Sequence, residues 1–163
     1  MKAVVIYDSV FGNTEKIARA IASGLGLQEN EGVFQVDSVT PAHLGGMELI
    51  VVGSPTRGFR PTKGITQFIG HLPPKHLSQV NIAAFDTRVR ITDVNSAFLT
   101  FVVNIFGYAA QPVADGLRKK GGKLIAEPEG FFVEDKEGPL FLGELERAEE
   151  WARLLVNNPT RQI

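Results

Sequence analysis

The chain has 163 residues, enough for one hydrophobic core and too few to divide into two, so we expect a single domain over residues 1–163. Its 17 Lys and Arg nearly balance 18 Asp and Glu, and a net charge of −1 gives no reason to expect nucleic acid or an anionic membrane as a partner. The absence of cysteine excludes disulfides, thiolate metal sites, cysteine-bound iron–sulfur clusters and a cysteine nucleophile.

The N-terminal apolar run, Ala3–Tyr7, ends after five residues at Asp8. It is too short for the hydrophobic region of a signal peptide and for a membrane span. We therefore expect a cytoplasmic protein with no membrane partner and no metal site. Any electron-transfer chemistry requires a cofactor other than protein sulfur.

Short apolar runs rich in β-branched residues alternate along the chain with segments of helical spacing. Strands are predicted at Ala3–Tyr7, Val33–Val36, Leu49–Val52, Asn81–Phe85 and Lys123–Ala126. Helices are predicted at 14–25, 61–72, 111–120 and 144–156. This alternation predicts an α/β fold with a parallel sheet and helices on both of its faces.

Two segments do not fit this alternation. Residues 95–110 are apolar and aromatic, which is compatible with a buried helix start, a covering flap or a dimer surface. Residues 131–142 alternate in polarity and contain a Glu137-Gly138-Pro139 turn, so they either continue the fifth strand or form an irregular segment.

Three loops are candidates for the functional site, because ligands of open α/β sheets bind outside the carboxyl ends of the strands. They begin at Asp8, Ser54 and Asp86.

In the first loop, Ser9 and Thr14 offer hydroxyls, Gly12 permits a turn, and Asn13 can cap the helix that Thr14 begins. Amide N–H groups and the helix dipole then favour an anion, most simply a phosphate. The alternative is a plain helix cap that binds nothing.

Familiar nucleotide motifs are absent. The chain has no G-x-x-x-x-G-K-[ST], and Gly24-Leu25-Gly26 lies at the end of a predicted helix, with no third glycine. ATP, GTP and a Rossmann-type dinucleotide are therefore disfavoured. A single terminal phosphate, held by hydroxyls and amides, suits the first loop better.

Most of the chain resembles the flavodoxin family. The resemblance is carried by "VVIYDSVFGNTEKIARAI" at the N-terminus, "LIVVGSPTRGFRPTKGITQFI" around the third strand, "IAAFDTR" at the fourth strand and the C-terminal segment from Gly121. It implies a flavodoxin-like three-layer sandwich whose five-stranded parallel sheet has the order 2-1-3-4-5. No long insertion interrupts the fifth strand, so a short-chain member is the nearer comparison.

The resemblance also implies a cofactor, flavin mononucleotide (FMN), held by the three loops, and a role in shuttling electrons between redox partner proteins. By position, the expected FMN-binding residues are Ser9, Val10, Phe11, Gly12, Asn13, Thr14, Pro55, Thr56, Arg57, Gly58, Phe59, Asp86, Thr87 and Arg88. No catalytic residue is predicted.

The chain departs from electron-shuttle flavodoxins in its aromatic and charged residues. Phe59 is the only aromatic of the second loop, and Val89 and Ile91 occupy the region where a tyrosine is usual. Loss of one aromatic stack weakens binding by roughly tenfold. Basic residues follow the third and fourth strands: Arg57, Arg60, Lys63, Arg88 and Arg90. This basic rim predicts a partner with an acidic docking surface and a flavin potential less negative than that of an acidic flavodoxin.

The sequence also bears on three other functions. A receiver domain is disfavoured, because Asp8 is a lone acid after the first strand and Gly53-Ser54-Pro55 stands where the phosphoacceptor belongs. An FMN-dependent NAD(P)H:quinone-type oxidoreductase stays open, although no acid–base pair stands out and one-electron transfer is favoured over turnover. A cofactor-free interaction module also stays open. We expect a monomer or a weak homodimer.

Overall fold

The computed structural model describes residues 1–28, 31–90, 97 and 107–157. The strands are β1 (Ala3–Tyr7), β2 (Val33–Gln35), β3 (Leu49–Pro55), β4 (Asn81–Val89), β5 (Lys123–Leu124) and β6 (Glu129–Val133). The helices are α1 (Asn13–Gly24), α2 (Pro41–Leu44), α3 (Lys63–His71), α5 (Ala110–Lys119) and α6 (Glu144–Asn157), with a 3-10 turn, η1, at Val36–Ser38.

All pairs between these strands are parallel, and the order is β2-β1-β3-β4-β5, which confirms the predicted order 2-1-3-4-5. Two short strands, β5 and β6, share the fifth position of the sheet, and both pair with β4. β5 pairs with the start of β4, at Asn81 and Ile82, whereas β6 pairs with its end, from Phe85 to Val89. The fifth strand is therefore interrupted and then continues as β6, one of the two outcomes expected for residues 131–142.

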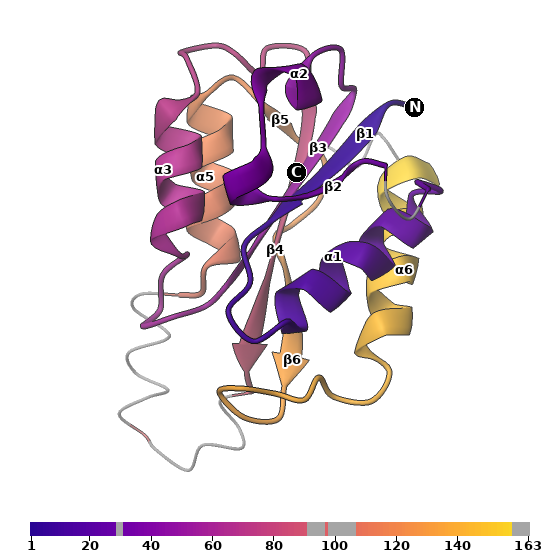
Figure 1. Ribbon diagram of the computed structural model, residues 1–163, viewed down its shortest axis with the longest axis vertical. Coiled ribbons are helices and arrows are strands. Elements are labelled where there is room, and N and C mark those ends of the chain that lie inside the picture. Colours follow the sequence, from indigo (N-terminus) through magenta and orange to yellow (C-terminus); the bar gives the residue numbers. More distant parts are fainter. Residues whose placement is uncertain (29–30, 91–96, 98–106, 158–163) are drawn as a thin grey trace.

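Helices cover both faces of the sheet, with α1 and α6 on one face and α3 and α5 on the other (Figure 1). Because successive side chains of a strand point to opposite faces, β1 serves two cores. Val5 packs with the core under α1 and α6, and Val4 and Ile6 pack with the core under α3 and α5. Burial on both faces explains why the strands are continuous apolar runs.

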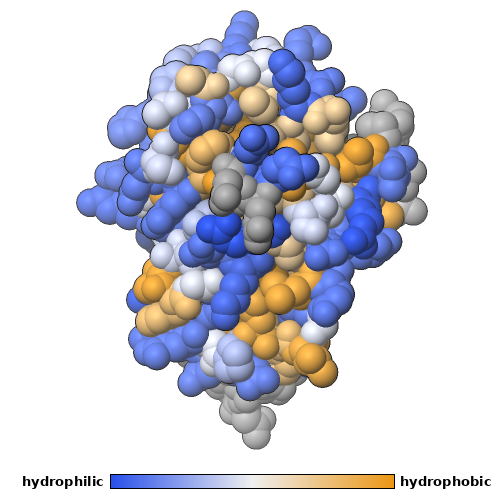
Figure 2. Space-filling model, turned by 45° about the vertical axis from the view of Figure 1, so that its right-hand side comes forward, coloured by the Kyte–Doolittle hydropathy of each residue, from blue (hydrophilic) through white to orange (hydrophobic). Residues whose placement is uncertain are grey.

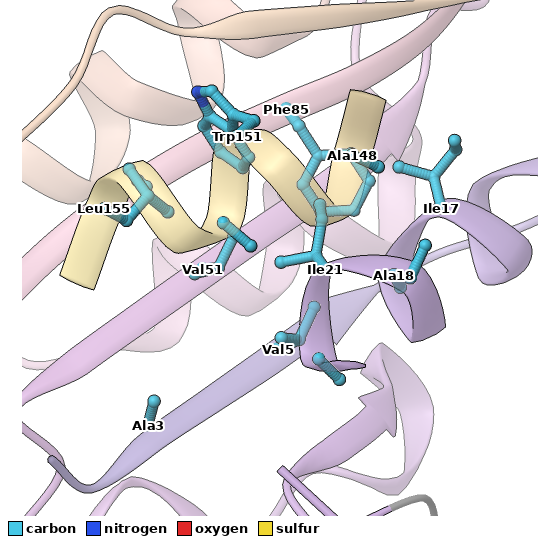
Figure 3. Close-up of a cluster of buried hydrophobic side chains, with 14 of the residues drawn as sticks. Ala3, Val5, Ile17, Ala18, Ile21, Val51, Phe85, Ala148, Trp151 and Leu155 are labelled. Carbon is cyan, nitrogen blue, oxygen red and sulfur yellow. The ribbon is translucent and has the colours of Figure 1, made fainter. Parts of the chain in front are cut away.

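The core under α1 and α6 is built from helical stripes recognisable in the sequence. Ile17 and Ile21 of α1 face Ala148 and Trp151 of α6, and Phe85 of β4 lies beneath them (Figure 3). All of these side chains are buried. The two helices thus hold the start of α1 in a fixed place against the sheet.

The predicted ends of two strands were wrong. β3 continues to Pro55 and β4 continues to Val89, because Ser54 pairs with Asp86 and β6 supplies a further partner for the end of β4. Polar side chains marked a strand end in the sequence, but parallel pairing on both sides extends the strand past them. Residues 86–89 are therefore strand and not loop.

Two short elements were missed by the sequence pattern. η1 and α2 are too short to show helical periodicity, and α2 relies on local signals. Thr40 caps it, Pro41 occupies its first position, and the Nδ1 of His43 accepts a hydrogen bond from the Thr40 amide at 3.1 Å. His43 and His71 therefore lie in α2 and at the end of α3, and His76 lies in the turn that follows α3.

Most of the apolar segment 95–110 lies outside the described residues. Its last residues lead into α5, where Ala109 and Ala110 are buried. Among the helices described, none is both long and apolar enough to cross a membrane.

Candidate functional site

A pocket of about 420 Å³ lies at the edge of the sheet where the strands end, within the size range of small-molecule sites. It is lined by Val10, Phe11, Thr56, Arg57, Gly58, Val89, Val133 and Lys136. The first five of these belong to the predicted set, and Val89 directly follows its last member, Arg88. Val133 and Lys136, at the end of β6 and just beyond, were missed, because the sequence did not reveal that the interrupted fifth strand ends beside the first two loops.

The first loop leaves the N-terminus of α1 without a side-chain cap. Gly12 occupies the cap position with φ of 85°, as expected for a turn closed to most residues, and its amide donates a hydrogen bond to the Ser9 Oγ at 3.1 Å. The helix has no side-chain cap hydrogen bond. The first N–H groups of α1 and its dipole therefore suit an anion.

The predicted capping role of Asn13 was wrong. α1 begins at Asn13 itself, and the Asn13 Nδ2 donates a hydrogen bond of 2.9 Å to the carbonyl oxygen of Glu137. Only 7% of Asn13 is exposed. The side chain thus connects α1 to the segment that follows β6.

Thr14, another predicted residue, also has a protein partner. Its Oγ1 lies 2.8 Å from the Oγ1 of Thr87, and both residues are buried. This hydroxyl pair links the first turn of α1 to β4. The two threonines therefore contribute to the packing that positions the first loop.

The second loop is a tight hairpin. Arg57 and Arg60 exchange backbone hydrogen bonds of 2.9 and 3.1 Å, and Gly58 and Phe59 between them have φ of 53° and 65°, the signs of a type I′ turn. A bulky residue rarely adopts a positive φ. Residues with such strained backbones cluster at functional sites. Phe59 itself is not among the residues that line the pocket.

The aromatic side chain in the pocket is Phe11, from the first loop. Phe11 is 44% exposed, and the Arg57 guanidinium lies 5.9 Å from the centroid of its ring. Phe11 was among the residues expected to bind FMN, whereas Phe59, the aromatic residue of the second loop, does not line the pocket.

Asp86 and Arg88, predicted in the third loop, form a buried ion pair. The Nη2 of Arg88 lies 2.7 Å from the Oδ2 of Asp86, which also accepts a hydrogen bond of 2.8 Å from the Ala110 amide. Burial raises the pKa of the Asp86 carboxyl, and the hydrogen bond from Arg88 opposes that rise. Asp86 has no exposed surface, so its carboxylate holds β4 to the start of α5.

Neighbouring groups complete this arrangement. The Arg88 guanidinium lies 3.7 Å from the centroid of the Tyr108 ring, and a Cβ on Gly130 would lie within 2.5 Å of the guanidinium. The Oγ1 of Thr56 accepts a hydrogen bond of 2.9 Å from the Ala109 amide. The absence of a side chain at Gly130 therefore leaves room in β6 for the Arg88 guanidinium.

The outer edge of β6 is occupied by a second charged group. Arg147 lies 2.6 Å from Glu144 and 3.0 Å from Glu129, and the Glu144 carboxylate accepts a hydrogen bond of 2.6 Å from the Phe132 amide. Arg90 lies 4.4 Å from the centroid of the Phe141 ring. Arg88 is thus paired with Asp86, and Arg90 contacts the rings of Phe132 and Phe141. The basic rim therefore consists of Arg57, Arg60 and Lys63 from the predicted set, together with Lys136.

Figure 2 shows an apolar area in the lower half of the molecule, the half toward which β4 and β6 point in Figure 1. Exposed apolar side chains of the loops after β1 and β6 are Val10, Phe11 and Leu142. Within the described part of the chain, no group of three or more Asp, Glu or His side chains is placed to hold a metal ion.

No protein-family model and no curated protein matches the chain. Similar solved structures include a flavodoxin from the domain Archaea (TM-score 0.70, 21% identity, 99% of this chain and 100% of that one) and flavodoxin 1 from Bacillus cereus (0.70, 20%, 96% and 97%). A flavodoxin, WrbA-like protein from Agrobacterium tumefaciens is also similar (0.72, 17%, 99% and 99%). The resemblance found in the sequence is confirmed in three dimensions: this chain has the flavodoxin-like fold.

Proposed function

We propose that the chain binds FMN at the carboxyl edge of the sheet and transfers electrons between redox partner proteins. The observation that carries this proposal is the pocket beside the uncapped N-terminus of α1, formed where the loops after β1 and β3 meet. When bound, FMN supplies the one-electron chemistry. The protein's part is to bind the cofactor, orient it and set its electrostatic surroundings.

The residues present fit such a ligand. Gly12 and Ser9 shape a turn in front of the first N–H groups of α1, which suits a terminal phosphate. The pocket walls include Val10, Phe11 and Val89, which suit a planar apolar ring. A polar end and an apolar wall therefore lie on the same edge.

The charges at this edge favour an anionic ligand and an acidic partner. Arg57 and Lys136 line the pocket, and Arg60 and Lys63 are exposed nearby in the chain. Cations near the flavin stabilise its reduced, anionic form, which makes the potential less negative. The same exposed cations suit a redox partner with an acidic docking surface.

A cofactor-free interaction module is the second candidate, and a specific observation favours it. The side chains of Asn13 and Thr14, both expected to contact FMN, already bond to Glu137 and Thr87. A loop whose polar groups are satisfied within the protein does not require a ligand to be stable.

Titration of the purified chain with FMN and with riboflavin separates these functions. An electron carrier retains FMN through gel filtration and binds riboflavin at least about tenfold more weakly, because riboflavin lacks the phosphate. A chain that retains neither flavin is the interaction module. Oxidation of NADH or NADPH with a quinone by the FMN-loaded chain would instead indicate the NAD(P)H:quinone-type oxidoreductase.

A further inference from the structure

The end of β6 and the segment after it form a tight hairpin, residues 132–141. The Phe141 amide donates to the Phe132 carbonyl at 3.0 Å, and the Glu134 amide donates to the Pro139 carbonyl at 2.9 Å. At the tip, the Gly138 amide donates to the Asp135 carbonyl at 2.9 Å. The hairpin tip is therefore held by its own backbone.

The tip of the hairpin contacts the first residue of α1. The Asn13 Nδ2 donates to the Glu137 carbonyl at 2.9 Å, across 124 positions of sequence. Gly138 packs so closely that a Cβ there would lie 2.7 Å from the same Nδ2, and its φ of 108° further disfavours other residues. Both observations fix the tip against the start of α1, at the end of the first loop.

This contact holds Lys136, the residue before Glu137, beside the pocket. Lys136 directly precedes Glu137, lines the pocket together with Arg57, and has its amide held by the Asp135 carboxylate at 2.7 Å. Glu134, Asp135 and Glu137 are exposed on the same tip but do not line the pocket. The cation is thus the charged group of the hairpin that faces the site.

We propose that the hairpin is a fourth loop of the site and that Lys136, placed by the bond between Asn13 and Glu137, makes the site prefer a flavin that carries a phosphate. The inference rests on the proposed function, because it concerns the same pocket. Lys136 directly precedes Glu137, whose carbonyl oxygen accepts the Asn13 hydrogen bond at the start of α1, where the phosphate is expected. Asn13 is a positioning residue that acts through Lys136.

The test compares dissociation constants for FMN and riboflavin, measured by flavin fluorescence. Lys136→Gln is expected to weaken FMN by about threefold to fivefold and to leave riboflavin unchanged, because an exposed cation contributes modestly to one charge contact. Lys136→Arg keeps the charge and is expected to keep the preference. Lys119→Gln, an exposed lysine near the end of α5, is the matched control and changes neither constant.

The positioning role is tested by Asn13→Ala and by the double variant with Lys136→Gln. If Asn13 acts through Lys136, the double variant prefers FMN over riboflavin no less than Lys136→Gln alone does. Amide hydrogen exchange at residues 134–138 is then also faster in Asn13→Ala than in the wild type. Additive losses of FMN affinity, with unchanged exchange, would overturn the positioning role.

Two failures are distinguishable. A wild-type chain that binds neither flavin overturns the proposed function. If the wild type binds FMN, but prefers it over riboflavin by no larger a factor than Lys136→Gln does, only the proposal of a fourth loop is overturned.

Discussion

The carboxyl edge of the sheet has two halves that use charged residues in opposite ways. Along the second half of β4 and beside β6, Arg88 pairs with buried Asp86, and Arg147 pairs with Glu144 and Glu129. At the loops after β1 and β3, Arg57 is exposed beside Phe11, and α1 begins without a side-chain cap. In the first half the charged side chains pair with one another, and in the second half a cation stays exposed beside helix N–H groups that no side chain caps.

Burial explains why Asp86 is paired. A charge removed from water is costly unless it is paired and hydrogen-bonded, so the interior position of Asp86 requires Arg88 and the Ala110 amide. Exposed cations keep their hydration and require no partner. The identity of an arginine in the sequence therefore says less about function than the solvent exposure of its guanidinium.

The largest expected effect tests the buried half. Asp86→Asn leaves the Arg88 guanidinium, 16% exposed, without its carboxylate and should lower the free energy of unfolding by about 3 kcal/mol. Urea denaturation measures the loss. Asp37→Asn, at an exposed position of η1, should change stability by less than about 0.5 kcal/mol. Equal stabilities of the two variants would show that the ion pair does not hold the fold.

Glu144→Gln should cost about 2 kcal/mol at pH 7, because the carboxylate accepts hydrogen bonds from Arg147 and from the Phe132 amide. Burial tends to raise the pKa of Glu144, but these hydrogen bonds outweigh it and lower the pKa below its ordinary value.

Because the pKa of Glu144 is lower in the folded state, its stabilisation is complete above the ordinary glutamate value and is lost as pH falls through the folded value. The stability gap between the wild type and Glu144→Gln should therefore narrow as pH drops below about 4.3. Urea midpoints over a pH series give this gap, and a gap that is constant with pH contradicts the assignment.

The threonine pair lies between the two halves. Thr14→Val leaves the buried Thr87 hydroxyl unpaired and should cost about 1–2 kcal/mol, whereas Thr14→Val with Thr87→Val should recover much of that loss. Thermal unfolding of the single and double variants measures both effects. A double variant as unstable as the sum of its parts would mean that the two hydroxyls do not act as a pair.

The smallest effect belongs to the exposed half. Arg57→Gln should leave stability within about 0.5 kcal/mol of the wild type, since the side chain is exposed. In the FMN-loaded chain it should make the potential more negative by roughly 30 mV, because one cation is removed from the pocket. Potentiometric titration measures the shift, and Lys119→Gln serves as the control. A shift toward less negative values would contradict the proposed role of the rim.

Much of the fold could be predicted because its signals are local. Continuous apolar runs gave β1 and the starts of β3 and β4, and the spacing of Ile17 and Ile21 gave α1. Strand ends could not be predicted, because Asp86 looks like the start of a loop until β6 is placed beside it. Polarity marks exposure in most strands, but here a polar strand end is buried with its partner.

The candidate site divides in the same way. The sequence predicted the edge of the sheet and residues that line its pocket, such as Val10 and Arg57, since position after a strand determines that edge. It did not reveal that Arg88 pairs with Asp86 or that Lys136 reaches the pocket.

The sequence by itself thus determined the alternation of elements and, through the flavodoxin resemblance, the strand order. Only the tertiary structure decided which polar groups are engaged. Asn13 bonds to Glu137 and Thr14 bonds to Thr87, contacts that span 124 and 73 positions of sequence. Local spacing cannot encode such partners, because they are chosen by how the interrupted fifth strand returns to the first loop.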